Sequence, residues 1–226
     1  MTASPFAGGV LPRWQDGVIR LLDIAPDARW NGVFAPGMKI CAAWLDVPVR
    51  EGQIVPNDEE VRFHDSRLEE ARDEAGQPGL VVDDATFQAI LPRGAPRPAC
   101  LAGYHMSFLH ALLGGPWDQP PWRMCLYRLA RVYGLGKGGD VRLEALAREA
   151  AGSGWGKSGA DNWYDPPAAC RVIQGRLVLD ALLRLSRPNM LVALSCAKVL
   201  PPPEAEPFGR APGWAALPGS EFHDFE

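Results

Sequence analysis

Residues 151–158 constrain the fold more than any other stretch, because they read AGSGWGKS and fit the loose form of a phosphate-binding loop. A working loop of this kind leaves a buried strand and opens a helix, whose N-terminal N–H groups hold the phosphate. Here Asp140 can cap a helix, and apolar side chains recur at helical spacing up to Ala150, so a helix precedes the loop. Pro166 and Pro167 delay the next helix. The surroundings favour a Gly-rich connection between two helices, with nucleotide binding as an alternative.

Helical periodicity recurs along the chain and predicts a mainly α-helical fold. Gly175 lies inside the last expected helix, where glycine costs about 1 kcal/mol relative to alanine, so we expect it to mark close packing against a neighbour. Residues 39–49 are apolar enough for one or two short strands or a buried turn. The helices that we expect cover residues 14–24, 58–75, 84–91, 101–113, 122–133, 141–151 and 166–187.

Proline-rich stretches divide the chain into four predicted parts. Residues 1–91 form a smaller, irregular α+β part, and residues 92–99, with the sequence PRGAPRPA, form a linker. Residues 100–200 form a helical core, and residues 201–226 form a tail rich in proline, acids and aromatics. We expect both ends of the chain to be extended arms. Aromatic residues spaced along such an arm are suited to docking on another surface, in the same molecule or on a partner. In the tail they are Phe208, Trp214, Phe222 and Phe225.

Charge is spread unevenly along the chain. Residues 57–76 hold 8 acidic and 3 basic side chains, whereas residues 92–187 hold 13 basic and 7 acidic ones. A basic middle part can face nucleic acid or an acidic partner, or it can be screened by the acidic parts of the same chain. The residues that we expect to contact phosphate or nucleic acid are Arg123, Arg128, Arg131, Lys137, Arg142, Arg148 and Lys157.

The five cysteines are scattered, which excludes a CxxC metal or redox pair and indicates reduced thiols in the cytoplasm. His105 and His110 are five residues apart, so a helix would point them about 140° apart and they would not share a metal ion. Cys100 with His105 is a conceivable nucleophile pair, but no nucleophile motif surrounds it. The first five residues lack the character of a signal peptide, and the longest apolar run, 190–200, is too short to span a bilayer. We expect no catalytic residue, metal, cofactor or membrane contact.

These patterns predict a non-catalytic cytoplasmic protein that works through protein–protein contacts. An accessory or assembly subunit fits best, with a protein partner or a second copy of the chain bound, and a phage or another mobile element is one candidate source. The first alternative is a helical protein that binds nucleic acid through the basic surface. The second is an enzyme that binds a nucleotide at residues 151–158.

Overall fold

Antiparallel strands form the larger part of a mixed β-sheet. They are β1 (Asp16–Pro26), β2 (Lys39–Arg50), β3 (Gln53–Ile54), β4 (Arg62–Arg72) and β5 (Pro78–Val82). β1 pairs with β2 over its whole length, β2 pairs with β4, and β4 pairs with β5. The short β3 forms a hairpin with the end of β2. The computed structural model describes residues 16–26, 34–50, 53–55, 60–72, 78–96, 98–114, 122–136, 142–157 and 167–185.

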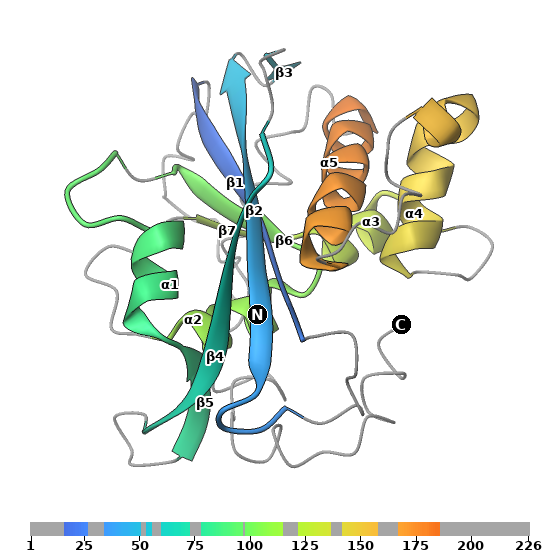
Figure 1. Ribbon diagram of the computed structural model, residues 1–226. Helices are drawn as coiled ribbons and strands as arrows, with labels where there is room; N and C mark the ends of the chain where they lie inside the picture. The colour runs from blue at the N-terminus through green and yellow to red at the C-terminus, as the bar shows by residue number, and fades with distance from the viewer. Residues whose placement is uncertain are drawn as a thin grey trace, which may run out of the picture.

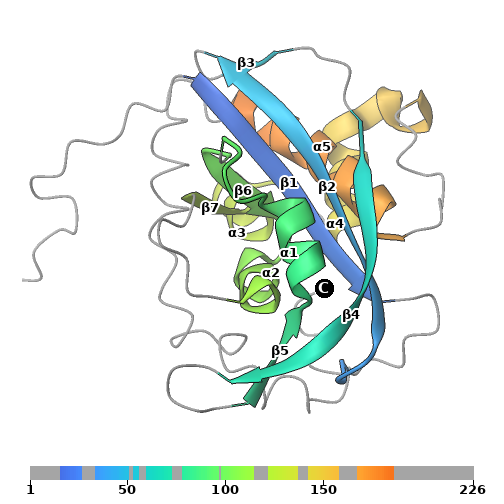
Figure 2. The same cartoon turned by 60° about the vertical axis from the view of Figure 1, so that its left-hand side comes forward.

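Two short strands extend this sheet in the parallel direction. β6 (Cys100–Gly103) pairs with β1, and β7 (Trp122–Cys125) pairs with β6. The order across the sheet is β5-β4-β2-β1-β6-β7, and the sheet is curled, with β4 and β5 turning away from the other strands (Figure 2). The segment 92–99, predicted as a linker, therefore connects two parts of one sheet, and the backbone N–H of Ala99 donates to the carbonyl of Val18 at 2.9 Å.

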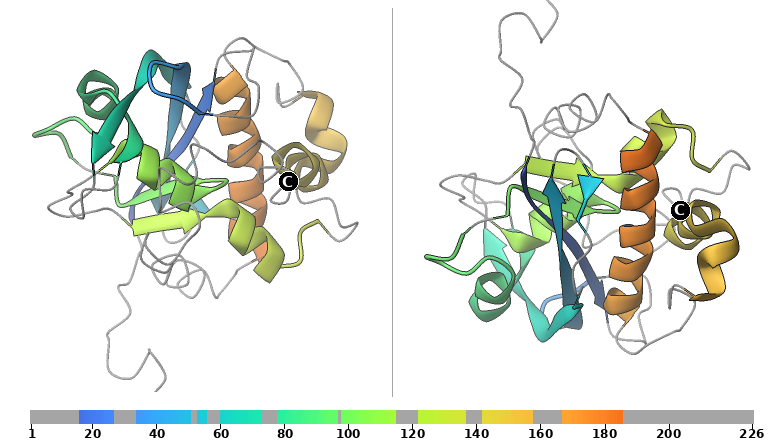
Figure 3. Two further views of the ribbon diagram at one scale, coloured as in Figure 1. Left: turned by 90° about the horizontal axis from the view of Figure 1, so that it is seen from below. Right: turned by 90° about the horizontal axis from the view of Figure 1, so that it is seen from above.

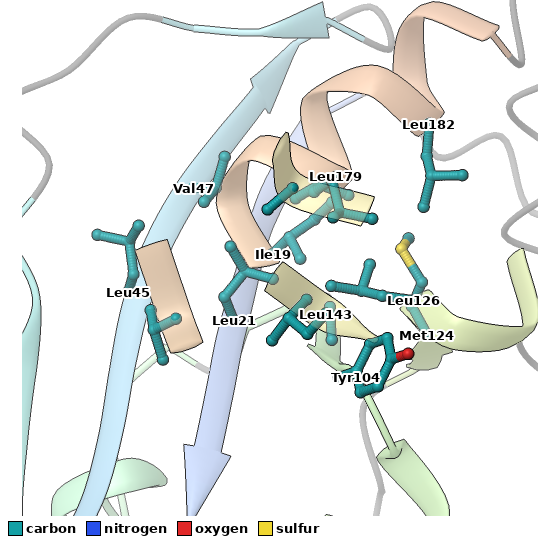
Figure 4. Packing of buried hydrophobic residues seen from close by; sticks show 14 of the residues in the cluster. Ile19, Leu21, Leu45, Val47, Tyr104, Met124, Leu126, Leu143, Leu179 and Leu182 are labelled. Atoms are coloured by element: carbon teal, nitrogen blue, oxygen red, sulfur yellow. The ribbon is translucent and has the colours of Figure 1, made fainter. Parts of the chain in front are cut away.

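Helices cover both faces of the sheet (Figure 1). α1 (Asp84–Ile90) and α2 (Met106–Leu113) lie on one face. On the other, α5 (Pro167–Leu185) lies along β1 and β2, α3 (Leu126–Val132) packs beside it, and α4 (Leu143–Ala151) packs on its outer side (Figure 3). The α5 face holds the larger core, whose packing Figure 4 shows, with Ile19, Leu21, Leu45, Val47, Met124, Leu126, Leu143, Leu179 and Leu182 labelled.

This architecture is an α/β fold, so the prediction of a mainly α-helical protein is wrong. The first error concerns residues 14–24, where a helix was expected and β1 is found. Ile19 and Leu21 point to the α5 face, whereas Leu22 and Ile24 point to the other face. A strand that is buried on both faces has a nearly continuous apolar run instead of an alternating one, and such a run also fits helical spacing.

The second error concerns residues 58–75, which include β4 instead of a helix. Ser66 and Leu68 of this strand are buried, while Phe63, Arg67 and Glu69 on its other face are exposed. The many charged side chains resemble a solvated helix, but pairing with β2 on one side and β5 on the other outweighs the weak intrinsic preference of such residues for strands. Residues 39–49, for which one or two short strands or a buried turn were expected, form most of one long strand, β2.

Two further helices were predicted too long at their beginnings. The segment 101–113 opens with β6 before α2 begins at Met106, and the segment 122–133 opens with β7 before α3 begins at Leu126. In both cases the first residues, 101–103 and 122–125, belong to the parallel part of the sheet. Short apolar runs of this kind cannot be assigned to strand or helix by periodicity alone.

The helices expected at 84–91, 141–151 and 166–187 are confirmed as α1, α4 and α5. Asp83 caps α1, because its side chain accepts a hydrogen bond from the backbone N–H of Thr86 at 2.7 Å. Gly152 ends α4 with a φ of +53°, a value that favours glycine. Gly175, which was expected to mark close packing, is buried, but a Cβ there would lie 3.4 Å from Cδ1 of Leu126, which is an ordinary contact, so the packing does not require glycine.

Candidate binding site at the carboxyl edge of the parallel strands

The parallel strands β1, β6 and β7 bring three polar segments to one edge of the sheet. Asp23 lies on β1 just beyond the residues that pair with β6, and Tyr104 and His105 follow the end of β6 directly. Tyr127 follows the end of β7, and its backbone N–H donates to the carbonyl of Tyr104 at 3.3 Å. In α/β sheets, ligands commonly bind outside the carboxyl ends of parallel strands, so this edge is the place to look for a site.

A buried ion pair forms the base of this edge. Nε of Arg171, on the first turn of α5, lies 3.2 Å from Oδ2 of Asp23 and donates a hydrogen bond to Oδ1 at 3.3 Å. The Asp23 side chain is 8% exposed and the Arg171 side chain 44%. Burial raises the pKa of Asp23, and Arg171 offsets this only in part. Within the described part of the chain, the two terminal nitrogens of Arg171 make no hydrogen bond, so its guanidinium can accept a second anion.

Aromatic rings lie beside the ion pair. The ring centroids of His105 and Tyr104 are 4.5 Å apart, and those of His105 and Tyr127 are 5.4 Å apart. Burial, together with the nearby positive charge of Arg171, lowers the pKa of His105 to about 4. His105 is therefore neutral at pH 7 and does not repel the guanidinium.

A second arginine completes the group from α3. Nη1 of Arg131 donates to the hydroxyl of Tyr127 at 3.3 Å, and its guanidinium carbon lies 5.8 Å from the centre of the Tyr127 ring. Arg131 of α3 thus contacts Tyr127, while the charge of Arg171 of α5 acts on His105 next to it. We call the following set the Arg–Tyr cluster: Asp23, Tyr104, His105, Tyr127, Arg131 and Arg171.

The cluster is suited to binding an anion, because guanidinium groups bind carboxylates and phosphates in a planar, two-pronged geometry. The nearby thiols do not supply a nucleophile. Cys100 is fully buried in the core and its pKa is raised by burial, while burial and the neighbouring Asp65 raise the pKa of Cys41 to about 12. The Sγ of Cys100 donates to the carbonyl of Leu101 at 3.3 Å, as expected of a small buried residue.

Of the predicted basic residues whose side chains the structure describes, only Arg131 belongs to this cluster. Arg128 and Arg142 are exposed, on α3 and immediately before α4. Arg148 donates to Glu144 at 2.8 Å and lies over the ring of Trp155 at 5.3 Å, so its charge is already balanced. The backbones of Arg123 and Lys157 lie in β7 and in a 3₁₀ helix, η1 (Gly152–Lys157), and Lys137 lies outside the described residues.

The Gly-rich stretch 151–158 follows a helix, as the sequence predicted. Helix α4, instead of a strand, leads into this stretch, and η1 begins at Gly152, where α4 ends. Trp155 of η1 packs against the core beneath α4. These residues therefore make a helix end with an attached 3₁₀ turn, and the strand that a phosphate-binding loop would leave is replaced by a helix.

Sequence reasoning missed five residues of the cluster. Asp23 and Arg171 are separated by 148 positions, and no local pattern links them. Tyr104, His105 and Tyr127 were assigned to helices, although each follows a short apolar run that could have been read as a buried strand. Recognition of β6 and β7 as parallel neighbours would have placed these three side chains at one edge.

The remaining predicted positions and the comparisons add no further site. The four aromatic residues of the segment 201–226 lie outside the described residues. Among the residues that are described, no group of three or more His, Cys, Asp or Glu side chains could hold a metal ion. None of the helices described combines the length and hydrophobicity required to cross a bilayer. Comparison with protein-family models, with curated proteins and with solved structures gave no match.

Proposed function

We propose that the protein is a non-catalytic accessory or assembly protein, which binds an acidic segment of a protein partner or of a second copy at the Arg–Tyr cluster. The observation that carries this proposal is the contact of Arg131 with the ring and hydroxyl of Tyr127, next to His105, whose pKa the partly exposed Arg171 also lowers. Arginine and tyrosine are the residues most enriched at the energetic centres of protein interfaces. Carboxylates of a bound segment would pair with the guanidinium groups, and its apolar side chains would pack on the rings.

A protein segment fits this site better than nucleic acid does. The cluster offers two guanidinium groups, and that of Arg171 is already paired with Asp23, so little positive charge remains for the many phosphates of a nucleic acid. The basic surface around α4 is also interrupted by acids, because Glu144 pairs with Arg148 and Glu149 accepts a hydrogen bond from the backbone N–H of Gly136 at 2.8 Å. A continuous basic track of the kind that binds nucleic acid is therefore broken at α4.

The proposal also assigns the protein to the cytoplasm. Cys41, Cys100, Cys125 and Cys170 support this assignment, because all four are free thiols buried in the core. Reducing compartments maintain thiols in that form.

The test uses a fluorescein-labelled peptide of sequence (Glu-Glu-Phe)₄ and a labelled single-stranded DNA of 12 nucleotides as probes. Fluorescence anisotropy with the full chain at low and physiological salt gives the dissociation constant of each. We expect the peptide to bind in the micromolar to submillimolar range and the DNA to bind at least tenfold more weakly. Tighter binding of the DNA would instead support the nucleic-acid alternative.

Variants locate the peptide on the protein. Arg131→Gln and Arg171→Gln each remove one charge-assisted contact, so each should weaken peptide binding roughly 10-fold. Arg93→Gln is the matched control, because Arg93 is 81% exposed and follows α1 on the opposite face of the sheet. An equal effect of all three substitutions would indicate nonspecific attraction and would exclude the cluster as the binding site.

A further inference from the structure

We infer that Asp23 takes up a proton when an acidic segment binds to Arg171, so the Arg–Tyr cluster binds its partner more tightly as the pH falls. This inference rests on the proposed function, because it concerns the acidic ligand that the proposed function assigns to the cluster. It adds a regulatory property to that function, which is a dependence of partner binding on pH near neutrality.

Asp23 is a buried carboxylate that depends on Arg171 to balance its charge. Its side chain is 8% exposed, and among the residues that the structure describes its ion pair is with Arg171. Oδ2 of Asp23 lies 3.2 Å from Nε of Arg171, but this oxygen is buried and accepts no hydrogen bond from any described residue. A buried carboxylate with an oxygen that lacks a hydrogen bond is weakly stabilised in its charged form. Any loss of the charge of Arg171 therefore favours the neutral acid.

Arg171 presents donors to a second carboxylate while it stays paired with Asp23. Asp23 contacts its Nε, whereas the two terminal nitrogens make no hydrogen bond within the described part of the chain. The Arg171 side chain is 44% exposed, so a ligand can reach it while Asp23 remains buried. A guanidinium group has five N–H donors but a single positive charge. A ligand carboxylate at the terminal nitrogens would share that charge with Asp23.

Sharing one guanidinium places two carboxylates close together, and their repulsion raises the pKa of the more buried one. Burial already raises the pKa of Asp23, and Arg171 offsets this only in part. On ligand binding, Asp23 therefore takes a proton from the buffer onto a carboxylate oxygen and becomes a neutral acid. The neutral acid does not compete for the guanidinium, so a lower pH favours the complex.

The other described groups around Asp23 leave this role to it. Asp23 raises the pKa of Cys41 on β2, which is about 12, so this thiol stays neutral near pH 7. Asp65 on β4, the neighbour of Cys41 in the sheet, is exposed. His105 has a pKa of about 4 and is neutral at pH 6 and above. Of these groups, only Asp23 is a buried carboxylate paired with Arg171.

The experiment measures the affinity of the full chain for the (Glu-Glu-Phe)₄ probe between pH 6 and pH 8 at constant ionic strength. A rhodamine label replaces fluorescein, because fluorescein itself titrates in this range. The glutamates of the probe stay charged, since their usual pKa is about 4.3. Asp23→Asn imitates the protonated acid. Asp180→Asn is the matched control, because Asp180 also belongs to an ion pair on α5, with Arg184 at 2.9 Å.

We expect the unaltered chain to bind the probe roughly tenfold more tightly at pH 6 than at pH 8, since full uptake of one proton changes affinity about tenfold per pH unit. Asp23→Asn should bind at pH 8 about as tightly as the unaltered chain does at pH 6, with no dependence on pH. Asp180→Asn should keep the dependence.

The outcomes separate the inference from the proposed function. If Asp23→Asn keeps the dependence on pH, another group titrates and the inference is wrong. If the probe binds through Arg131 and Arg171 with equal affinity at pH 6 and pH 8, the inference fails while the proposed function stands. If the probe does not bind at either pH, the proposed function fails and the inference with it.

Calorimetry counts the protons without any variant, so the test does not depend on the folding of Asp23→Asn. The probe is titrated into the unaltered chain at pH 7 in Tris and in Bis-Tris, two cationic buffers that differ in ionisation enthalpy and do not compete for an anion site. The difference in binding heat gives the number of protons taken up per complex. The inference requires an uptake of about half a proton. An uptake of zero, or a release of protons, would overturn it.

Discussion

His105 makes the stability of the protein depend on pH. Its pKa of about 4 in the folded protein lies below the usual 6.5, because burial and Arg171 disfavour the charged ring. The unfolded chain therefore binds more protons between these two values, so this contribution to stability is complete above pH 6.5 and is lost as the pH falls towards 4. A difference of this size corresponds to roughly 3 kcal/mol.

His105→Gln should remove this dependence, because the amide keeps a polar group of similar size that does not titrate. We expect the urea-unfolding free energy of the unaltered protein to fall by roughly 2–3 kcal/mol more than that of the variant between pH 7 and pH 4.5. The NMR shift of the His105 ring proton gives an independent reading, with a midpoint near 4. A midpoint near 6.5 would show that the ring is solvated and that the cluster is more open than described.

Single residues differ in how far the sequence reveals their role. Asp83 could be predicted as a cap and the cysteines as buried apolar groups, because both depend on local sequence or on side-chain chemistry. The pairing of Asp23 with Arg171 could not, since it depends on how α5 lies across β1. The candidate site depends on such long-range contacts, so it could not be predicted from the sequence.

At the scale of elements, two glycines show opposite packing demands. A Cβ at Gly175 would lie 3.4 Å from Cδ1 of Leu126 and 3.8 Å from Cδ2 of Leu21, which are ordinary contacts. A Cβ at Gly103, at the end of β6, would collide with Cδ1 of Leu109 and lie 3.0 Å from the carbonyl oxygen of Leu22. The helix α5 therefore tolerates a methyl group that the junction of β6 with α2 does not.

Gly175→Ala should accordingly raise the unfolding free energy by about 0.5–1 kcal/mol, because alanine has the higher helix propensity. Gly103→Ala should lower it by about 1–3 kcal/mol, because Leu109 or the backbone must shift to make room. Equilibrium denaturation in urea measures both, and each variant serves as the control for the other. A loss of stability in Gly175→Ala would mean that α5 packs more tightly on α3 than these distances indicate.

The elements that were predicted correctly are those whose signals are local. α1 begins at the Asp83 cap, α4 ends at Gly152 and α5 begins at a proline, and the residues within these helices repeat at helical spacing. β1 and β4 were missed for opposite reasons. β1 is buried on both faces and lacks alternation, whereas β4 is so exposed that its charged residues resemble a surface helix. Both strands are specified by their partners in the sheet, and a single sequence does not reveal those partners.

At the scale of the whole molecule, the sheet links the two parts of the chain that proline composition separates. β1 precedes the segment 92–99 and β6 follows it, yet these strands are hydrogen-bonded neighbours. α5, from the far end of the described chain, packs on β1 and β2. Because both hydrophobic cores use side chains from before and after this segment, we expect residues 16–185 to unfold as one cooperative unit.

Leu101→Ala tests this cooperativity. Leu101 is fully buried on β6, the strand that joins the part of the chain after the linker to the sheet formed before it. It should lower the unfolding free energy by about 2–5 kcal/mol. Hydrogen exchange followed by mass spectrometry should then show β2 and α5 losing protection together, since both depend on the same sheet. Phe63→Ser is the control: this side chain is 57% exposed, and its loss should change stability by less than about 0.5 kcal/mol. If α5 exchanged rapidly while β2 stayed protected, the two parts would unfold separately and the predicted boundary at 92–99 would mark two domains.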